Sequence, residues 1–109
     1  LRHLKNFKKV QKLFKFRGAS RLGSLRHATH AQIVKAFKRT GFIPSSHFIK
    51  RLKDIRTSNL GLRTFKDLEV IFRKGVIGTS RGYKTIKYGR FAIIYEPVSR
   101  VLVTLKPLL

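Results

Sequence analysis

The sequence predicts an α+β fold in which two to three N-terminal helices are followed by a small antiparallel β-meander. Three observations support this class. Apolar residues recur three or four positions apart in the first half of the chain, as on one face of a helix. Near the end, runs of branched and aromatic residues are separated by glycine or proline turns, as in antiparallel strands. The apolar share of 42% is too high for a disordered basic tail, so we expect a single small domain over residues 1–109.

The charge of the chain points to a polyanionic partner. It holds 26 Lys and Arg against 4 Asp and Glu, for a net charge of +22. Such a charge opposes compaction of the free chain and favours a dense polyanion as ligand. The four carboxylates are scattered and form no obvious pair for acid–base chemistry or metal binding: Asp54, Asp67, Glu69 and Glu96. Cysteine is absent, which excludes disulfides and thiolate metal sites within these residues.

Residues 1–27 are predicted to form a basic helix and an Arg-rich loop. The helix covers residues 1–16, and its apolar stripe consists of Leu4, Phe7, Val10 and Phe14. Most of its other positions are basic, and those expected to face phosphates are Lys5, Lys8, Lys9, Lys12 and Lys15. The alternative is a solvated helix face with snorkelling lysines.

The loop over residues 17–27 is rich in glycine, serine and arginine and has no sustained apolar period. A short strand around residues 22–25 is compatible with this pattern. Arginines on a flexible backbone suit phosphate contact, and the RNA-binding candidates here are Arg17, Arg21 and Arg26.

Residues 28–56 are predicted to be helical. Thr29 should cap a second helix that runs to Lys38 or Arg39, and Gly41 should take the left-handed position after it. Lys38 and Arg39 complement the negative end of this helix and are further RNA-binding candidates.

A short third helix is predicted after Pro44, because apolar residues recur there at helical spacing: Phe48, Ile49, Leu52 and Ile55. Residues 56–65 are predicted to be a loop. Residues 66–106 are predicted to be mainly β, with three antiparallel strands at 84–88, 90–96 and 100–105.

The segment GTSRG, residues 78–82, brackets two hydroxyl residues with glycines. Its backbone N–H groups, with Thr79, Ser80 and Arg81, would form a small anion-binding turn. Lys84 follows closely and is a further RNA-binding candidate. A simple turn is the equal alternative, and a P-loop is excluded because the Gly-Lys-Ser/Thr ending and its helix are missing.

Three tyrosines in or beside the strands, Tyr83, Tyr88 and Tyr95, are interleaved with cations and are candidates for stacking on bases. The alternative is that they belong to the core and keep their hydroxyls in water. His27 and His30 lie three residues apart with too few further ligands nearby, so no metal and no other cofactor is predicted. No apolar run approaches the roughly 20 residues of a membrane span, and no small-molecule substrate is expected.

Among polyanions, the sequence favours RNA. No helix-turn-helix or zinc-finger pattern with base-reading side chains occurs. Basicity that extends from end to end, loops included, is typical of ribosomal proteins, which cover many phosphates without needing a base code. Binding of the first helix to an anionic membrane surface is the alternative, but a mixed domain follows that helix.

The stretches LKNFKKVQKLF (4–14) and RLGSLRHATHAQIVKAFKRTGFI (21–43) resemble the N-terminal half of the eighth small-subunit ribosomal protein family, in its divergent mitochondrial form. That family begins with a helix, crosses a short strand and runs a second helix into a Gly-Phe-Ile motif, which residues 41–43 match. Two pairing strands follow in the family, and RFAIIYEPVSRVLVTL would supply them. The chain departs from the family in its much longer intervening segment. Residues 78–82 resemble a turn of the family's C-terminal domain but precede these strands, so the two matches exclude each other.

This resemblance implies a structural constituent of the ribosome, without catalysis, whose partners are rRNA and neighbouring ribosomal proteins. The absence of a methionine even at position 1 is compatible with a removed targeting peptide. Together with the extreme basicity, it predicts a small-subunit protein of the mitochondrial matrix. Another ribosome-containing compartment is the alternative.

A second resemblance implies a different class of protein. Residues 83–105 resemble the sheet of RelE/ParE superfamily toxins, whose G-x-aromatic-x-I-I-Y strand is matched loosely at 89–95. It implies a ribosome-dependent mRNA endoribonuclease, in which the scissile phosphate would be held by Arg81, Tyr83, Lys84 and Arg90. The charge argues against it, since four carboxylates are few for an independently soluble enzyme.

Overall fold

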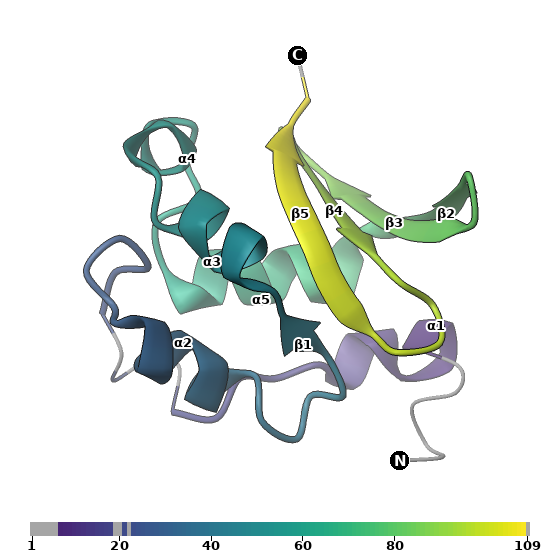
Figure 1. The fold of residues 1–109 in the computed structure, drawn as a ribbon, viewed down its shortest axis with the longest axis horizontal. Helices are drawn as coiled ribbons and strands as arrows, with labels where there is room; N and C mark the ends of the chain where they lie inside the picture. The colour runs from purple at the N-terminus through teal and green to yellow at the C-terminus, as the bar shows by residue number, and fades with distance from the viewer. Residues whose placement is uncertain (1–6, 19–20, 22, 109) are drawn as a thin grey trace.

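The computed structural model describes residues 7–18, 21 and 23–108, and in this part of the chain the protein is α+β. Helices pack against one face of a five-stranded mixed sheet, as Figure 1 shows. The predicted fold class is therefore confirmed. The sheet is larger and the helices are more numerous than the sequence predicted.

The helices are short, and most begin at a polar cap. Side-chain oxygens accept hydrogen bonds from backbone N–H groups of the first turn at Thr29, Ser45, Asp54 and Thr64. A short helix leaves a large share of its N–H groups without intrahelical partners, so these caps do much to define where each helix begins. The helical elements are α1 (Phe7–Val10), the 3-10 helix η2 (Gln11–Leu13), α2 (His30–Ala36), α3 (Ser46–Leu52), α4 (Ile55–Asn59) and α5 (Phe65–Lys74).

The sheet has the strand order β1-β5-β4-β3-β2. Its strands are β1 (Ile43–Pro44), β2 (Val76–Ser80), β3 (Tyr83–Tyr88), β4 (Phe91–Tyr95) and β5 (Val101–Pro107). The last four form an antiparallel meander, which confirms the three predicted strands as β3, β4 and β5. The added strand β1 pairs in parallel with β5, a pairing that no local pattern in the sequence indicates.

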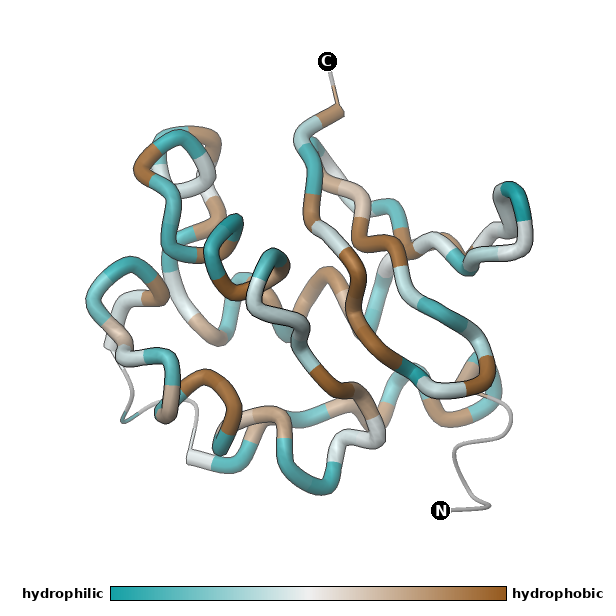
Figure 2. Tube along the Cα trace, in the orientation of Figure 1, coloured by the Kyte–Doolittle hydropathy of each residue, from teal (hydrophilic) through white to brown (hydrophobic). Residues whose placement is uncertain are grey.

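A cluster of phenylalanine rings fills the space among the helices. Eight of the nine phenylalanines contact another phenylalanine ring. Phe72 lies at the centre: it stacks on Phe14 with ring centroids 4.2 Å apart and meets Phe16 edge to face at 6.1 Å. The sheet adds aliphatic residues, chiefly Ile86, Ile93, Leu102 and Leu105. Figure 2 shows where the hydrophobic segments lie along the helices and the sheet.

The predicted first helix ends before residue 16. Among the described residues of this segment, helical geometry covers 7–13, and residues 14–16 are not helical. The reason is that Phe14 and Phe16 are both buried while Lys15 between them is exposed, an alternation that a helix cannot provide. Residues 1–6, including the candidate Lys5, lie outside the described part of the chain.

The second helix begins at its predicted cap but ends early. Thr29 forms a capping box with Gln32, whereas α2 stops at Ala36. Arg39, not a glycine, is the first left-handed residue after the helix, with φ of 69°. The hydroxyl of Thr40 fixes this turn, because it donates to the Phe37 carbonyl at 2.6 Å and accepts from a backbone N–H two residues on. Gly41 has the predicted positive φ, 87°, but it lies beyond this turn and does not end the helix.

The region after the second helix contains more helix than predicted. Lys53 ends α3, and Asp54 caps a separate helix α4, so residues 56–59 are helical where a loop was predicted. The prediction of mainly β structure for residues 66–106 was wrong at its start, since α5 is the longest helix described. Of the short strand predicted around residues 22–25, the described residues show a single bridge, between Ser24 and Thr64.

Candidate nucleic-acid interface

Five exposed cations from three separate segments surround one hollow of about 840 Å³. We call it the basic hollow, and its cations are Lys15, Arg17, Arg21, Lys35 and Lys66. The first three belong to the segment that follows η2, and the others to α2 and α5. The structure therefore brings together predicted candidates of the basic segment with two lysines that the sequence prediction missed.

The basic hollow is built on the buried ring of Phe16. This ring is 1% exposed and meets Phe37, just after α2, and Phe65, the first residue of α5, edge to face. Lys15 and Arg17 flank Phe16 in extended and turn backbone, so both point away from the core. The aromatic contacts thus fix the positions from which the cations extend.

The carboxylate in the hollow is already bound by the protein. Glu69 accepts the Phe16 backbone N–H at 2.8 Å and pairs with the Arg73 guanidinium at 3.3 Å. Arg73 also donates to the Phe14 carbonyl at 2.6 Å. Glu69 therefore ties the N-terminal segment to α5, and its charge is offset by Arg73 rather than by the cations around the hollow.

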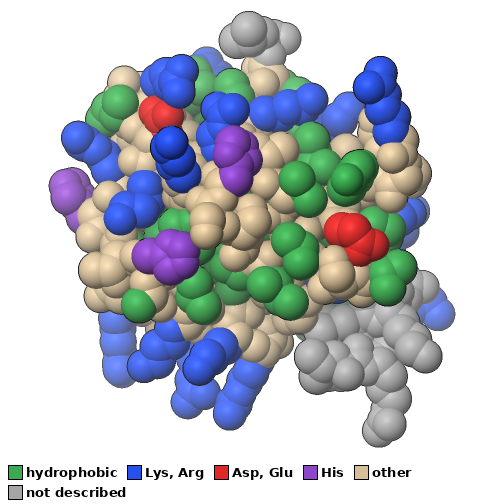
Figure 3. Space-filling model, in the orientation of Figure 1, with side chains coloured by type: hydrophobic (Ala, Val, Ile, Leu, Met, Phe, Trp, Pro, Cys, Tyr) green, Lys and Arg blue, Asp and Glu red, His purple; other side chains and the backbone are tan. Residues whose placement is uncertain are grey.

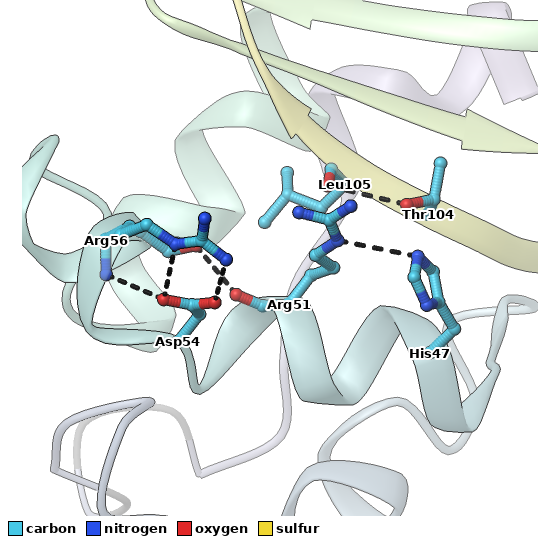
Figure 4. A network of polar contacts seen from close by, with 7 residues as sticks. His47, Arg51, Asp54, Arg56, Thr104 and Leu105 are labelled. Atoms are coloured by element: carbon cyan, nitrogen blue, oxygen red, sulfur yellow. Dashed lines mark hydrogen bonds and ion pairs between the residues drawn. The ribbon is translucent and has the colours of Figure 1, made fainter.

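The other three carboxylates are also used to hold the backbone. Asp67 completes the cap of α5, and Asp54 caps α4 and pairs with Arg56 at 2.8 Å (Figure 4). The hydrogen bond from the Arg56 side chain lowers the pKa of Asp54 from 3.8 to about 2. Glu96 accepts N–H groups of Val98 and Ser99 in the β4–β5 loop, and the bond from Ser99 is the largest cause of its lowered pKa.

Beside this network, Figure 4 shows Arg51 of α3 lying between Asp54 and His47. Its Nε donates to His47 Nε2 at 3.5 Å, and its carbonyl accepts from the Thr57 hydroxyl at 2.7 Å. These contacts join α3 to α4. Neither contact involves a carboxylate.

Six further predicted cations in the N-terminal half of the chain are exposed but do not line the basic hollow. Lys8, Lys9 and Lys12 lie on α1 and η2, and the chain from there runs along the lower edge of Figure 1 toward α2. Arg26, Lys38 and Arg39 lie in the turns before and after α2. Figure 3 shows Lys and Arg side chains projecting from this same lower edge.

The GTSRG segment forms the tip of a hairpin. Ser80 pairs with Tyr83, so Arg81 and Gly82 make a two-residue turn, with φ of 51° and 86°. Two positive φ values identify a type I′ turn, which matches the twist of the flanking strands. Thr79 accepts a hydrogen bond from Lys84 Nζ at 3.2 Å. The backbone therefore forms the simple turn of the second alternative. Four of the predicted candidates lie in or beside this turn: Thr79, Ser80, Arg81 and Lys84.

The set implied by the toxin resemblance does not converge on one point. Arg81, Tyr83 and Lys84 lie at one end of β3, whereas Arg90 follows its other end. A strand rises about 3.3 Å per residue, so the ends of β3 are roughly 17 Å apart. The backbone positions of this set therefore lie at opposite ends of β3.

The tyrosines divide between the two interpretations. Tyr95 is 3% exposed and packs on Phe42 with ring centroids 5.0 Å apart, so it belongs to the core and not to a stacking surface. Tyr83 and Tyr88 are 42% and 40% exposed. They lie five residues apart on β3, and because successive side chains of a strand point to opposite faces, Tyr83 and Tyr88 lie on opposite faces of the sheet.

Within residues 7–18, 21 and 23–108, no three His, Cys, Asp or Glu side chains gather as metal ligands would. No helix among them is long and apolar enough to cross a membrane. Comparison with known proteins finds no matching family model, no similar curated protein and no similar solved structure.

Proposed function

We propose that this protein is a structural constituent of a ribosome that binds rRNA through its phosphates. The observation that carries the proposal is the basic hollow, where five cations from three segments converge above a carboxylate that Arg73 already neutralises. A surface of this kind attracts a polyanion and offers no free carboxylate for acid–base chemistry. All four carboxylates of the sequence hold the protein's own backbone.

The mechanism is neutralisation of phosphate charge by cations held in fixed positions. Each Lys or Arg that meets a phosphate releases condensed counterions, which drives binding without reading bases. The phenylalanine core fixes the backbone on which Lys15, Lys35 and Lys66 stand, so less order has to be acquired on binding. Cations on α1 and η2 extend the same edge and would follow the RNA backbone beyond the hollow.

The resemblance of residues 4–14 and 21–43 to the eighth small-subunit ribosomal protein family supports assignment to a small subunit. Its divergent mitochondrial form is the basis for proposing the mitochondrial matrix as the compartment. Neighbouring ribosomal proteins would then be the second class of partner.

Crosslinking in native cells, followed by sequencing of the attached RNA, tests this function directly. We expect crosslinks at a few fixed positions of one small-subunit rRNA, and the rRNA itself identifies the compartment. Crosslinks scattered over mRNA, with new 3′ ends inside codons, would replace the proposal by the endoribonuclease alternative.

A charge-reversal pair tests the basic hollow itself. Lys35→Glu with Lys66→Glu should weaken rRNA binding and reduce the slope of log affinity against log salt by roughly 0.7 to 0.9 for each phosphate that is no longer neutralised. The matched control is Lys50→Glu with Lys74→Glu, which makes the same change in charge on exposed positions of α3 and α5 away from the hollow. Equal effects of the two pairs would show that only net charge matters and that the hollow is not the binding site.

A further inference from the structure

The sheet face turned away from the helices carries a second hollow, of about 780 Å³. It is lined mainly by residues of β2, β3, β4 and β5. It shares no lining residue with the basic hollow. We call it the open sheet face. None of its lining residues is acidic.

The strand register arranges this face in two rows. One row runs across the sheet through Gly78, Thr85 and Ile94, which are direct partners on β2, β3 and β4. The other contains Ala92 of β4 between Lys87 of β3 and Lys106 of β5. Two strand spacings separate the lysine Cα atoms, which is about 10 Å. Their flexible stems allow both ammonium groups to approach one another above Ala92.

Small residues keep the floor of this hollow low, and apart from the Thr85 hydroxyl it is apolar. Ala92 is fully buried although it lies on the outer face, and a methyl group added at Gly78 would lie 3.1 Å from the Thr85 hydroxyl. Bulky side chains at these positions would fill the hollow. The floor therefore suits a flat apolar group, such as the face of a nucleobase.

The rim supplies the groups that such a ligand requires. Tyr83 is 42% exposed and lines the hollow beside the hairpin tip, where Arg81 lies. Lys87 and Lys106 are exposed at the other end. An aromatic ring at one end and paired ammonium groups at the other match a base and its phosphates.

We propose that the open sheet face binds a single-stranded segment of RNA, with a base stacked on Tyr83 and phosphates held by Lys87 and Lys106. This deepens the proposed function and rests on it, because it names a second RNA element with unpaired bases. Bases in the interior of a duplex cannot stack on a side chain, since neighbouring pairs cover both faces, whereas unpaired bases can. Base–aromatic stacking tolerates any base, so the site would distinguish single-stranded from double-stranded RNA without distinguishing one base sequence from another.

Equilibrium binding of the full chain to two RNAs tests the inference. One is a short fluorescein-labelled oligouridylate, and the other is a blunt RNA duplex with the same number of phosphates. Tyr83→Leu should weaken oligouridylate binding at least about 5-fold, the lower end of what stacking contributes, and leave duplex binding unchanged. Tyr83→Phe, which keeps the ring, should restore it. Tyr88→Leu is the matched control, because Tyr88 has a similar exposure and lies on the other face of β3.

Charge reversal at the other end provides a second measurement that does not depend on the ring. Lys87→Glu with Lys106→Glu should weaken oligouridylate binding more than it weakens duplex binding, whereas the basic-hollow pair, Lys35→Glu with Lys66→Glu, should weaken both, because both RNAs carry phosphates. If the Tyr83 and Tyr88 variants behave alike, or if both RNAs respond equally to every variant, the open sheet face is not a single-strand site, while the proposed function stands. If an oligoglutamate peptide competes with the same dependence on Tyr83, the ligand is an acidic peptide and the inference is overturned.

Discussion

The helical side and the sheet side of this molecule bury their apolar residues by different means. The helices are three to ten residues long and are joined mainly by phenylalanine rings and side-chain caps. The sheet is held by backbone pairing of β2 through β5, with one register shift between β4 and β5, over buried aliphatic residues such as Ile86 and Ile93. One side therefore depends on individual side chains, and the other on a ladder of many similar bonds.

The difference bears on the two candidate surfaces. The basic hollow lies on the helical side, so its geometry depends on a few side-chain contacts, and removal of one can open it locally. The open sheet face lies on the ladder, where one substitution leaves most pairs intact. We therefore expect core substitutions to disturb the basic hollow more readily than the open sheet face.

Removal of the central ring should have the largest effect. Phe72→Ala is expected to lower the free energy of unfolding by about 3–5 kcal/mol, since it deletes a fully buried ring with aromatic neighbours on every side. Urea denaturation followed by circular dichroism measures it. Leu13→Ala, at a site 77% exposed, is the control and should change little. A loss below about 1 kcal/mol would mean that the rings are not what joins the helices.

The junction of the two sides can be tested at Gly75. A methyl group there would lie far inside van der Waals contact with Ile86 of the sheet and with the Ile71 carbonyl of α5. Gly75→Ala should therefore cost about 1–3 kcal/mol, because the helix must shift away from the sheet. Gly78→Ala is the matched control, since its nearest neighbour is a hydroxyl at 3.1 Å that can adjust. Equal losses in thermal or urea unfolding would contradict the close approach at Gly75.

Glu69→Ala should lower the local stability of the helical side more than that of the sheet side. It leaves the Phe16 N–H without its acceptor and removes the carboxylate that pairs with Arg73, which keeps only its bond to the Phe14 carbonyl, at a cost of about 1–3 kcal/mol. We expect faster amide exchange in residues 14–18 than in β4, measured by NMR. Glu69→Gln keeps an acceptor and should lose less. Uniformly faster exchange in both regions would show that the helical side and the sheet side open together, and that they do not differ in local stability.

The smallest expected effect is on acid stability. The folded-state pKa of Asp54 is about 2, below the ordinary 3.8, so the ionised carboxylate stabilises the fold above pH 3.8 and this contribution is lost as the pH falls toward 2. The advantage of the wild type over Asp54→Asn should therefore shrink across this window. Because the pair is exposed, about 1 M salt should also reduce the advantage. A difference that is constant with pH and salt would assign the effect to the cap alone.

The strands were predictable because local signals agreed along the chain. In β3, β4 and β5 the branched and aromatic residues are bounded by Gly89 and by the turn at residues 97–99, and nothing competes with this pattern. Helix α5 was missed because Val70, Ile71 and Phe72 are consecutive and resemble a strand. The capping box of Thr64 and Asp67, three residues apart, was the available signal for a helix.

The basic hollow could be predicted only in part. Lys15, Arg17 and Arg21 are near in sequence and share a basic segment, so composition identifies them. Lys35 and Lys66 join them only because Phe16 packs against the ends of α2 and α5, and such distant packing has no local signal. The turn at Arg81 could be predicted as a hairpin from its spacing, but the outward face of the sheet depends on a register that only the fold provides.

Tyr95, buried against Phe42 beneath Arg100, also gives the molecule an optical property. Burial raises the pKa of its phenol above the ordinary 10.0, although Arg100 acts in the opposite direction. The phenol therefore stays protonated in the folded core under alkaline conditions in which an unfolded chain would ionise it. No tryptophan absorbs in competition. Only the part of the phenolate absorbance that comes from Tyr95, beyond that of the exposed Tyr83 and Tyr88, thus reports opening of the core in alkali, without a label.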